Sequence, residues 1–146
     1  MAFVLKSPSA LARVELYAKP ASTAFAIGDL LAANINATAN TFIAATASTE
    51  FHIGVLQRTI ASTDSDYTSE TKVEVLVDEV GIWEVDVGTG TADINDEQGY
   101  IDLKDTNEAD VTASAIDALF VYQFVSGTVV RVKICSWAGL QRPADS

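Results

Sequence analysis

The chain offers few residues that could perform catalysis or hold a metal. It contains one histidine, His52, and one cysteine, Cys135. Any Ser-His-Asp or Cys-His arrangement must therefore use His52, and a zinc site built from several Cys or His ligands is excluded. His52 stands between Phe51 and Ile53, so strand alternation points it away from both, and we interpret it as a surface or hydrogen-bonded histidine. A lone cysteine excludes an internal disulfide and suits a reduced thiol.

Two loop segments resemble ligand-binding motifs only in part. The segment that begins at Asp93 alternates oxygen ligands as a calcium loop does, but Gln98 stands where such a loop needs glycine and Lys104 where it needs a bidentate glutamate. Gly88 and Gly90 form a Gly-x-Gly without a third glycine or a neighbouring basic residue to meet phosphate. Paired carboxylates could carry out acid–base chemistry, but among twenty carboxylates any chosen pair is mostly chance. We therefore predict no metal, no cofactor and no enzymatic activity.

Charge and hydropathy narrow the classes of partner. The 146 residues include twenty acidic and nine basic side chains, for a net charge of −11, and residues 64–117 hold sixteen of the acids but two of the bases. Because such a surface repels phosphate, we expect no nucleic-acid binding. No stretch approaches the roughly 20 apolar residues that cross a bilayer, and the apolar start is too short for a signal peptide, so we expect no membrane partner and synthesis in the cytoplasm.

Period-two alternation of apolar and polar residues dominates the chain and predicts strands. In residues 12–18 the even positions are apolar, which predicts a strand with one buried face. Two β-branched and aromatic runs flank Ser126-Gly127, which predicts a hairpin whose turn needs a positive φ. The expected strands are 12–18, 25–27, 41–45, 51–56, 73–77, 83–87, 118–125 and 128–134, with one short helical turn over 92–98. This pattern predicts a small, single-domain all-β fold, either a barrel or a sandwich.

Both ends differ from the middle. Residues 1–10 and 136–146 contain two of the three prolines and show no clear strand pattern. We therefore expect an N-terminal arm over 1–10, a β domain over 11–135 and a C-terminal tail over 136–146.

A series of short sequence motifs in a fixed order runs through residues 58–134. They are Thr59-Ile-Ala-Ser-Thr-Asp64-Ser-Asp66-Tyr67, Val73-Glu-Val75, Gly81-Ile-Trp83-Glu-Val-Asp86-Val-Gly88-Thr-Gly90-Thr, Gly99-Tyr-Ile-Asp102-Leu103, Asp110-Val-Thr-Ala-Ser114 and Val130-Arg-Val-Lys-Ile134. Through these motifs, about half of the chain resembles the small capsid decoration, or cement, proteins of tailed bacteriophages. The resemblance implies a non-enzymatic β domain that binds the outer surface of a phage head, strengthens the shell and acts as a homo-oligomer, which we expect to be a trimer.

The resemblance implies the major capsid protein as partner, and the charge distribution indicates which residues would touch it. The ends of the chain are basic and carry apolar residues without an evident strand partner, whereas the acidic block would face solvent. The predicted capsid or subunit contacts are Phe3, Val4, Leu5, Lys6, Arg13, Trp137, Leu140 and Arg142. Two other classes stay open: another virion part, such as a tail-tube or baseplate protein, and an enzyme or sugar-binding β module.

Overall fold

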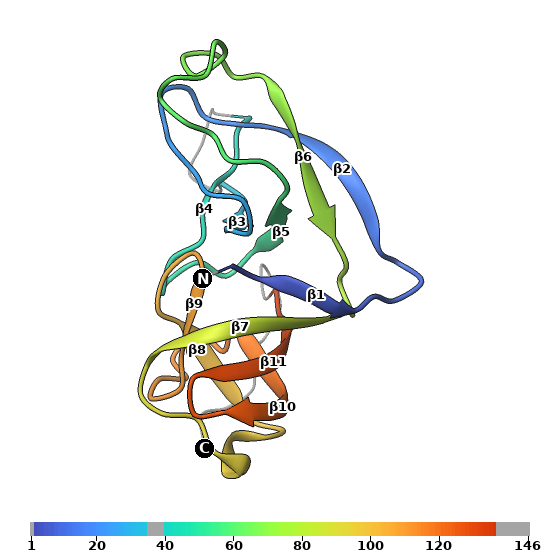
Figure 1. Ribbon diagram of the computed structural model, residues 1–146, viewed down its shortest axis with the longest axis vertical. Coiled ribbons are helices and arrows are strands. Elements are labelled where there is room, and N and C mark those ends of the chain that lie inside the picture. Colours follow the sequence, from blue (N-terminus) through green and yellow to red (C-terminus); the bar gives the residue numbers. More distant parts are fainter. Residues whose placement is uncertain (1, 35–39, 137–146) are drawn as a thin grey trace.

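The computed structural model describes residues 2–34 and 40–136, and strands dominate them (Figure 1). The elements form two sheets, one of six strands and one of five. The sequence prediction of an all-β fold is confirmed.

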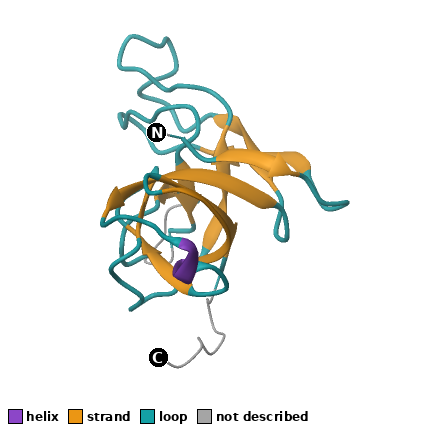
Figure 2. Ribbon diagram, turned by 60° about the horizontal axis from the view of Figure 1, so that its bottom comes forward, coloured by secondary structure: helices purple, strands orange, loops and turns teal. Residues whose placement is uncertain are grey.

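The six-stranded sheet contains a closed barrel. Its strands are β1 (Val4–Ser7), β7 (Ile82–Thr89), β8 (Tyr100–Leu103), β9 (Glu108–Asp110), β10 (Leu119–Ser126) and β11 (Val129–Ile134), in the order β1-β7-β11-β10-β8-β9. The second half of β7 also pairs in parallel with β9, which closes β7 to β11 into a five-stranded barrel, seen in Figure 2 with the short helix η1 (Ile94–Asp96) beside it. Strand β1 pairs with the first half of β7, where β9 does not reach.

The second sheet lies beside the barrel. It consists of β2 (Arg13–Ala18), β3 (Leu30–Ala32), β4 (Ile43–Ala44), β5 (His52–Leu56) and β6 (Lys72–Val77), in the order β2-β6-β5-β3-β4. All of its strand pairs are antiparallel, and β2 and β4 are its two outer strands. The backbone N–H of Phe42 donates to the carbonyl of Ala18 at 3.2 Å, so the two outer strands approach each other at one end.

Two apolar cores follow from this arrangement. The larger one fills the barrel around Trp83 and Leu119, and it also takes in Leu30 and Val55 from the five-stranded sheet. The smaller one lies on the other face of that sheet, around Leu31 and Val75. Because successive side chains of a strand point to opposite faces, Leu30 and Leu31 belong to different cores.

Most expected strands are present with small changes of boundary. The hairpin of β10 and β11 is confirmed, but its turn residues are Gly127 and Thr128, and Gly127 does not have the positive φ that we predicted. The expected strand over 25–27 is reduced to a single bridge between Phe25 and Ile60. The short helix lies inside the predicted range 92–98, and the carboxylate of Asp93 caps it.

The prediction of an N-terminal arm over residues 1–10 is wrong for residues 3–9. The Phe3 side chain is 3% exposed and lies in the larger core, and its backbone N–H donates to the carbonyl of Gly28 at 3.0 Å. Farther along, the backbone N–H of Ser9 donates to the carboxylate of Asp78 at 2.7 Å. The segment is therefore fixed at both ends. The partners of β1 and of Ser9 lie about 70 residues or more away in the sequence, so no local sequence pattern predicts these contacts.

Candidate contact surface

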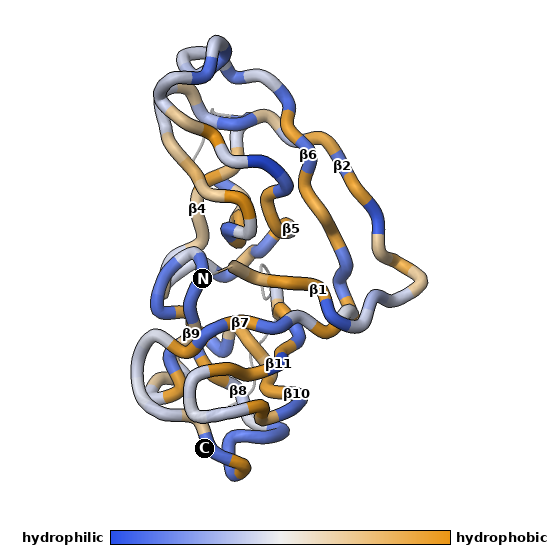
Figure 3. The backbone as a smooth tube through the Cα atoms, viewed as in Figure 1, coloured by the Kyte–Doolittle hydropathy of each residue, from blue (hydrophilic) through white to orange (hydrophobic). Residues whose placement is uncertain are grey.

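An apolar groove separates β1 from the five-stranded sheet. It has a volume of about 340 Å³, with Val4 and Leu5 of β1 on one wall and Leu76 of β6 on the other. Ile27, which is more than half exposed, also lines it. Figure 3 shows apolar residues along β1, β6 and β2 around this region.

The apolar surface continues from the groove onto β2. Val14 lies directly opposite Leu76 in the β2–β6 register, so the two side chains share one face of the sheet. Leu16 follows two residues later on that face, and Val14 and Leu16 are 55% and 59% exposed. We define the outer apolar surface as Val4, Ile27, Leu76, Val14 and Leu16. Singly exposed apolar residues are ordinary, but a contiguous set of this kind is typical of an interaction site.

The prediction that the apolar face of β2 is the buried one is therefore wrong. The alternation was correct, but the face that carries Val14 and Leu16 is the exposed one, whereas Tyr17 packs against the smaller core. Strand β2 extends past the part of the sheet that the barrel covers, so nothing among the described residues lies over its apolar face. The sequence could have indicated these two residues as a pair, but not whether they would be covered.

The structure divides the predicted contact residues into three groups. Val4, Lys6 and Arg13 are exposed, and Leu5 lines the groove, so these four remain accessible. Phe3 is buried in the core and is removed from the contact set. Trp137, Leu140 and Arg142 lie outside the described residues.

Exposed charged pairs lie on the two strands, β1 and β2, that contribute to the outer apolar surface. The guanidinium of Arg13 makes two hydrogen bonds to the carboxylate of Glu79, at 2.7 and 3.0 Å, and lies 3.4 Å from Glu15. The hydrogen bonds that Arg13 donates to Glu79 raise the pKa of Arg13, and Arg13 in turn lowers the pKa of the Glu79 carboxyl. On β1, the ammonium of Lys6 lies 4.0 Å from the carboxylate of Glu84. These exposed pairs contribute little to stability. Arg13 and Glu15 lie on the face of β2 opposite Val14 and Leu16.

Part of the acidic block has a structural role instead of facing solvent. Asp78, Asp102 and Asp117 are buried. The Asp102 carboxylate accepts three backbone N–H groups, from Ala115, Ile116 and Asp117, at 2.8–2.9 Å. The expectation that the whole block faces solvent is wrong for these three residues, because a loop that folds back on itself needs acceptors for its backbone N–H groups.

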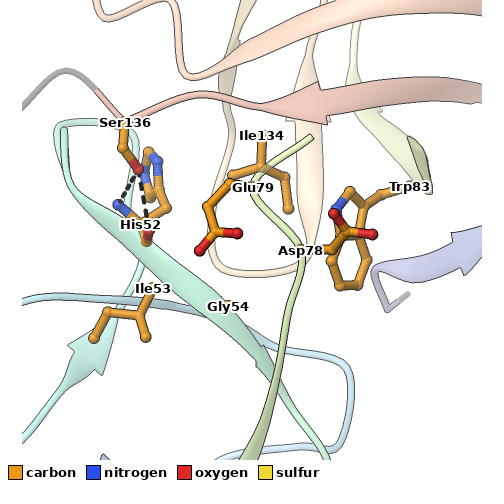
Figure 4. A pocket seen from close by; sticks show the side chains of 8 residues that line it. All are labelled: His52, Ile53, Gly54, Asp78, Glu79, Trp83, Ile134 and Ser136. Carbon is orange, nitrogen blue, oxygen red and sulfur yellow. Dashed lines mark hydrogen bonds between the residues drawn. The ribbon is translucent and has the colours of Figure 1, made fainter. Parts of the chain in front are cut away.

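A second cleft contains His52 (Figure 4). It has a volume of about 290 Å³ and is also lined by Asp78, Glu79 and Trp83. His52 is buried, its Nδ1 lies 2.7 Å from the carbonyl oxygen of Cys135, and its Nε2 lies 3.1 Å from the Thr49 hydroxyl. Burial lowers its pKa.

The hydroxyl bonded to the His52 ring is that of Thr49, which also donates to the carbonyl of Thr46 at 3.1 Å. Both ring nitrogens are engaged, and the Ser136 hydroxyl, drawn close to the ring in Figure 4, is hydrogen-bonded to the backbone of His52 instead. The interpretation of a hydrogen-bonded histidine is confirmed, but its position on the surface is not. Strand β5 directs His52 inward, so Phe51 is the exposed neighbour.

Three further observations bear on function. Within the described residues, no three His, Cys, Asp or Glu side chains are grouped so that they could hold a metal ion. No helix in residues 2–34 and 40–136 is long and apolar enough to cross a membrane. Compared with known proteins, the chain matches no family model and none of the curated sequences. The fold and the site therefore define a class of protein: a small all-β domain with an exposed apolar surface.

Proposed function

We propose that the protein is a non-enzymatic structural component of a phage virion that binds the outer surface of the head and stabilises the shell. Its partners are the major capsid protein and further copies of itself, and it reaches the outer capsid surface after synthesis in the host cytoplasm. The observation that carries this proposal is the outer apolar surface between β1 and β2, joined to the sequence resemblance described above.

The composition of the surface supports a protein partner. Its centre is aliphatic, with Val4, Ile27 and Leu76, and the exposed cation Lys6 follows Val4 in the same strand. Protein interfaces combine a desolvated apolar centre with a polar rim in this way. None of the five residues that define the outer apolar surface is a tryptophan or tyrosine of the kind that sugar binding uses; the exposed Tyr122 lies elsewhere, in β10.

Binding to heads that lack the protein provides the test. Val4→Asn and Ile27→Asn each remove an exposed aliphatic group, and Ile94→Asn is the matched control, because Ile94 is also exposed but lies in η1. A half-exposed aliphatic side chain that becomes buried contributes about 1 kcal/mol, so each test variant should bind heads about fivefold more weakly in a co-sedimentation assay.

Two results would oppose the proposal at different levels. Undiminished binding by both test variants would move the contact away from the groove. Failure of the wild-type chain to bind heads, with no change in head stability to heat, would reject the decoration function itself.

A further inference from the structure

Strand β2 has an edge that no described strand covers. Its six residues pair with β6 in an uninterrupted register, and β2 lies at the rim of the molecule in Figure 1. Exposed edges invite pairing with another chain, and natural proteins protect them with prolines, bulges, charged side chains or very short strands. Arg13–Ala18 contains no proline and no bulge, and its two charged residues, Arg13 and Glu15, have opposite signs.

The direction of the backbone N–H and C=O groups shows which residues of β2 can pair with a further strand. The N–H of Lys19 donates to the carbonyl of Thr71 at 3.0 Å, so Lys19 forms a hydrogen-bonded pair that continues the β2–β6 ladder. Because such pairs alternate along an antiparallel ladder, the backbone groups of Val14 and Leu16 point to the free edge. The edge ends at Ala18, whose carbonyl already accepts the N–H of Phe42, and at Ala12, whose N–H donates to the carbonyl of Ser9 at 3.2 Å.

We propose that a second copy of this chain pairs with that edge, antiparallel, about a two-fold axis at Val14. In this register Val14 meets Val14 of the second copy, and Arg13 meets its Glu15, on both sides of the axis. A two-fold contact must be self-complementary in this way.

The other registers place like charges opposite each other. An axis at Glu15 sets the two Glu15 carboxylates side by side, and an axis at Arg13 does the same for the guanidinium groups. An axis at Leu16 sets Arg13 opposite Lys19. Like charges directly opposite each other destabilise a ladder, so charge complementarity selects the axis at Val14.

The pairing has a consequence for the proposed function. A two-fold axis perpendicular to the joined sheet leaves the Val14 and Leu16 faces of both copies on the same side. The dimer would then present two outer apolar surfaces to one partner, so that two weak contacts act together. The inference deepens the self-association within the proposed function, and it replaces the expected trimer by a dimer contact, but its test needs no capsid.

Cross-linking tests the register. In a background with Cys135→Ser, Val14→Cys should form a disulfide-linked dimer on mild oxidation, because paired Cα atoms lie about 5.5 Å apart. Leu16→Cys is the matched control: in this register the two substituted positions are about 14 Å apart, and they should not cross-link. Equal cross-linking of both variants, or of Leu16→Cys alone, would overturn the register.

Sedimentation equilibrium at 0.15 M salt tests the association itself. Wild type should form a dimer of twice the 15.5 kDa chain mass, and Val14→Lys should raise the dissociation constant at least tenfold, whereas Ile94→Lys should not change it. A wild-type chain that stays monomeric up to about 100 μM, where micromolar association would be evident, would overturn the proposal. A trimer, or a dimer that Val14→Lys leaves unchanged, would overturn it equally.

Discussion

Shortening the buried side chain of Phe3 should destabilise the whole fold, although the residue lies near the start of the chain. Phe3 is 3% exposed and packs in the larger core, and β1 follows it immediately. Replacing a buried phenylalanine by alanine removes its transfer free energy and leaves a cavity, which together cost about 3–5 kcal/mol. We expect Phe3→Ala to lower the free energy of unfolding by that amount.

The neighbouring residue gives a control. Val4 is about half exposed on β1, so Val4→Ala should cost less than about 1 kcal/mol. Both substitutions leave β2 untouched, so any self-association through its edge affects the two variants equally.

Urea unfolding followed by tryptophan fluorescence measures the difference, because Trp83 is buried beside β1. With a urea dependence of about 1–3 kcal/mol per M, a loss of 3 kcal/mol moves the midpoint by at least about 1 M. If Phe3→Ala and Val4→Ala unfold within about 0.5 kcal/mol of each other, residues near the start are an arm after all.

Two further substitutions test buried polar groups. The Lys19 ammonium is fully buried and donates to the backbone carbonyls of Asp66 and Ser69 at 2.6 and 2.5 Å. Lys19→Met should therefore lower the free energy of unfolding by about 2–4 kcal/mol and expose residues 61–71 to limited proteolysis. An unchanged digestion pattern would contradict this role of Lys19. Burial lowers the pKa of His52 in the folded state, so the unfolded chain takes up the proton first, and the contribution of His52 to stability, complete above its ordinary pKa of 6.5, is lost as the pH falls below that value. Thermal unfolding between pH 7 and 5.5 should show a shallower pH dependence for His52→Gln than for wild type, and identical slopes would refute this linkage.

The sequence determined which segments become strands at most places where alternation was clear. The segments at 13–18, 72–77 and 82–89 and the hairpin of β10 and β11 fold as strands because β-branched and aromatic residues on a period of two suit a half-buried pleated surface. The scarcity of catalytic and metal-binding residue types was also a property of composition alone.

Tertiary structure decided which face of each strand is covered and which distant segments pair. Strand β1 forms because it pairs with the edge of β7, about 80 residues later in the sequence. Its four residues by themselves show no pattern that predicts a strand. Alternation placed Val14 and Leu16 together, but period two defines two faces without saying which one meets the core. The barrel covers one part of the five-stranded sheet and leaves β2 uncovered, and this placement, set by long-range packing, creates both the groove and the free edge.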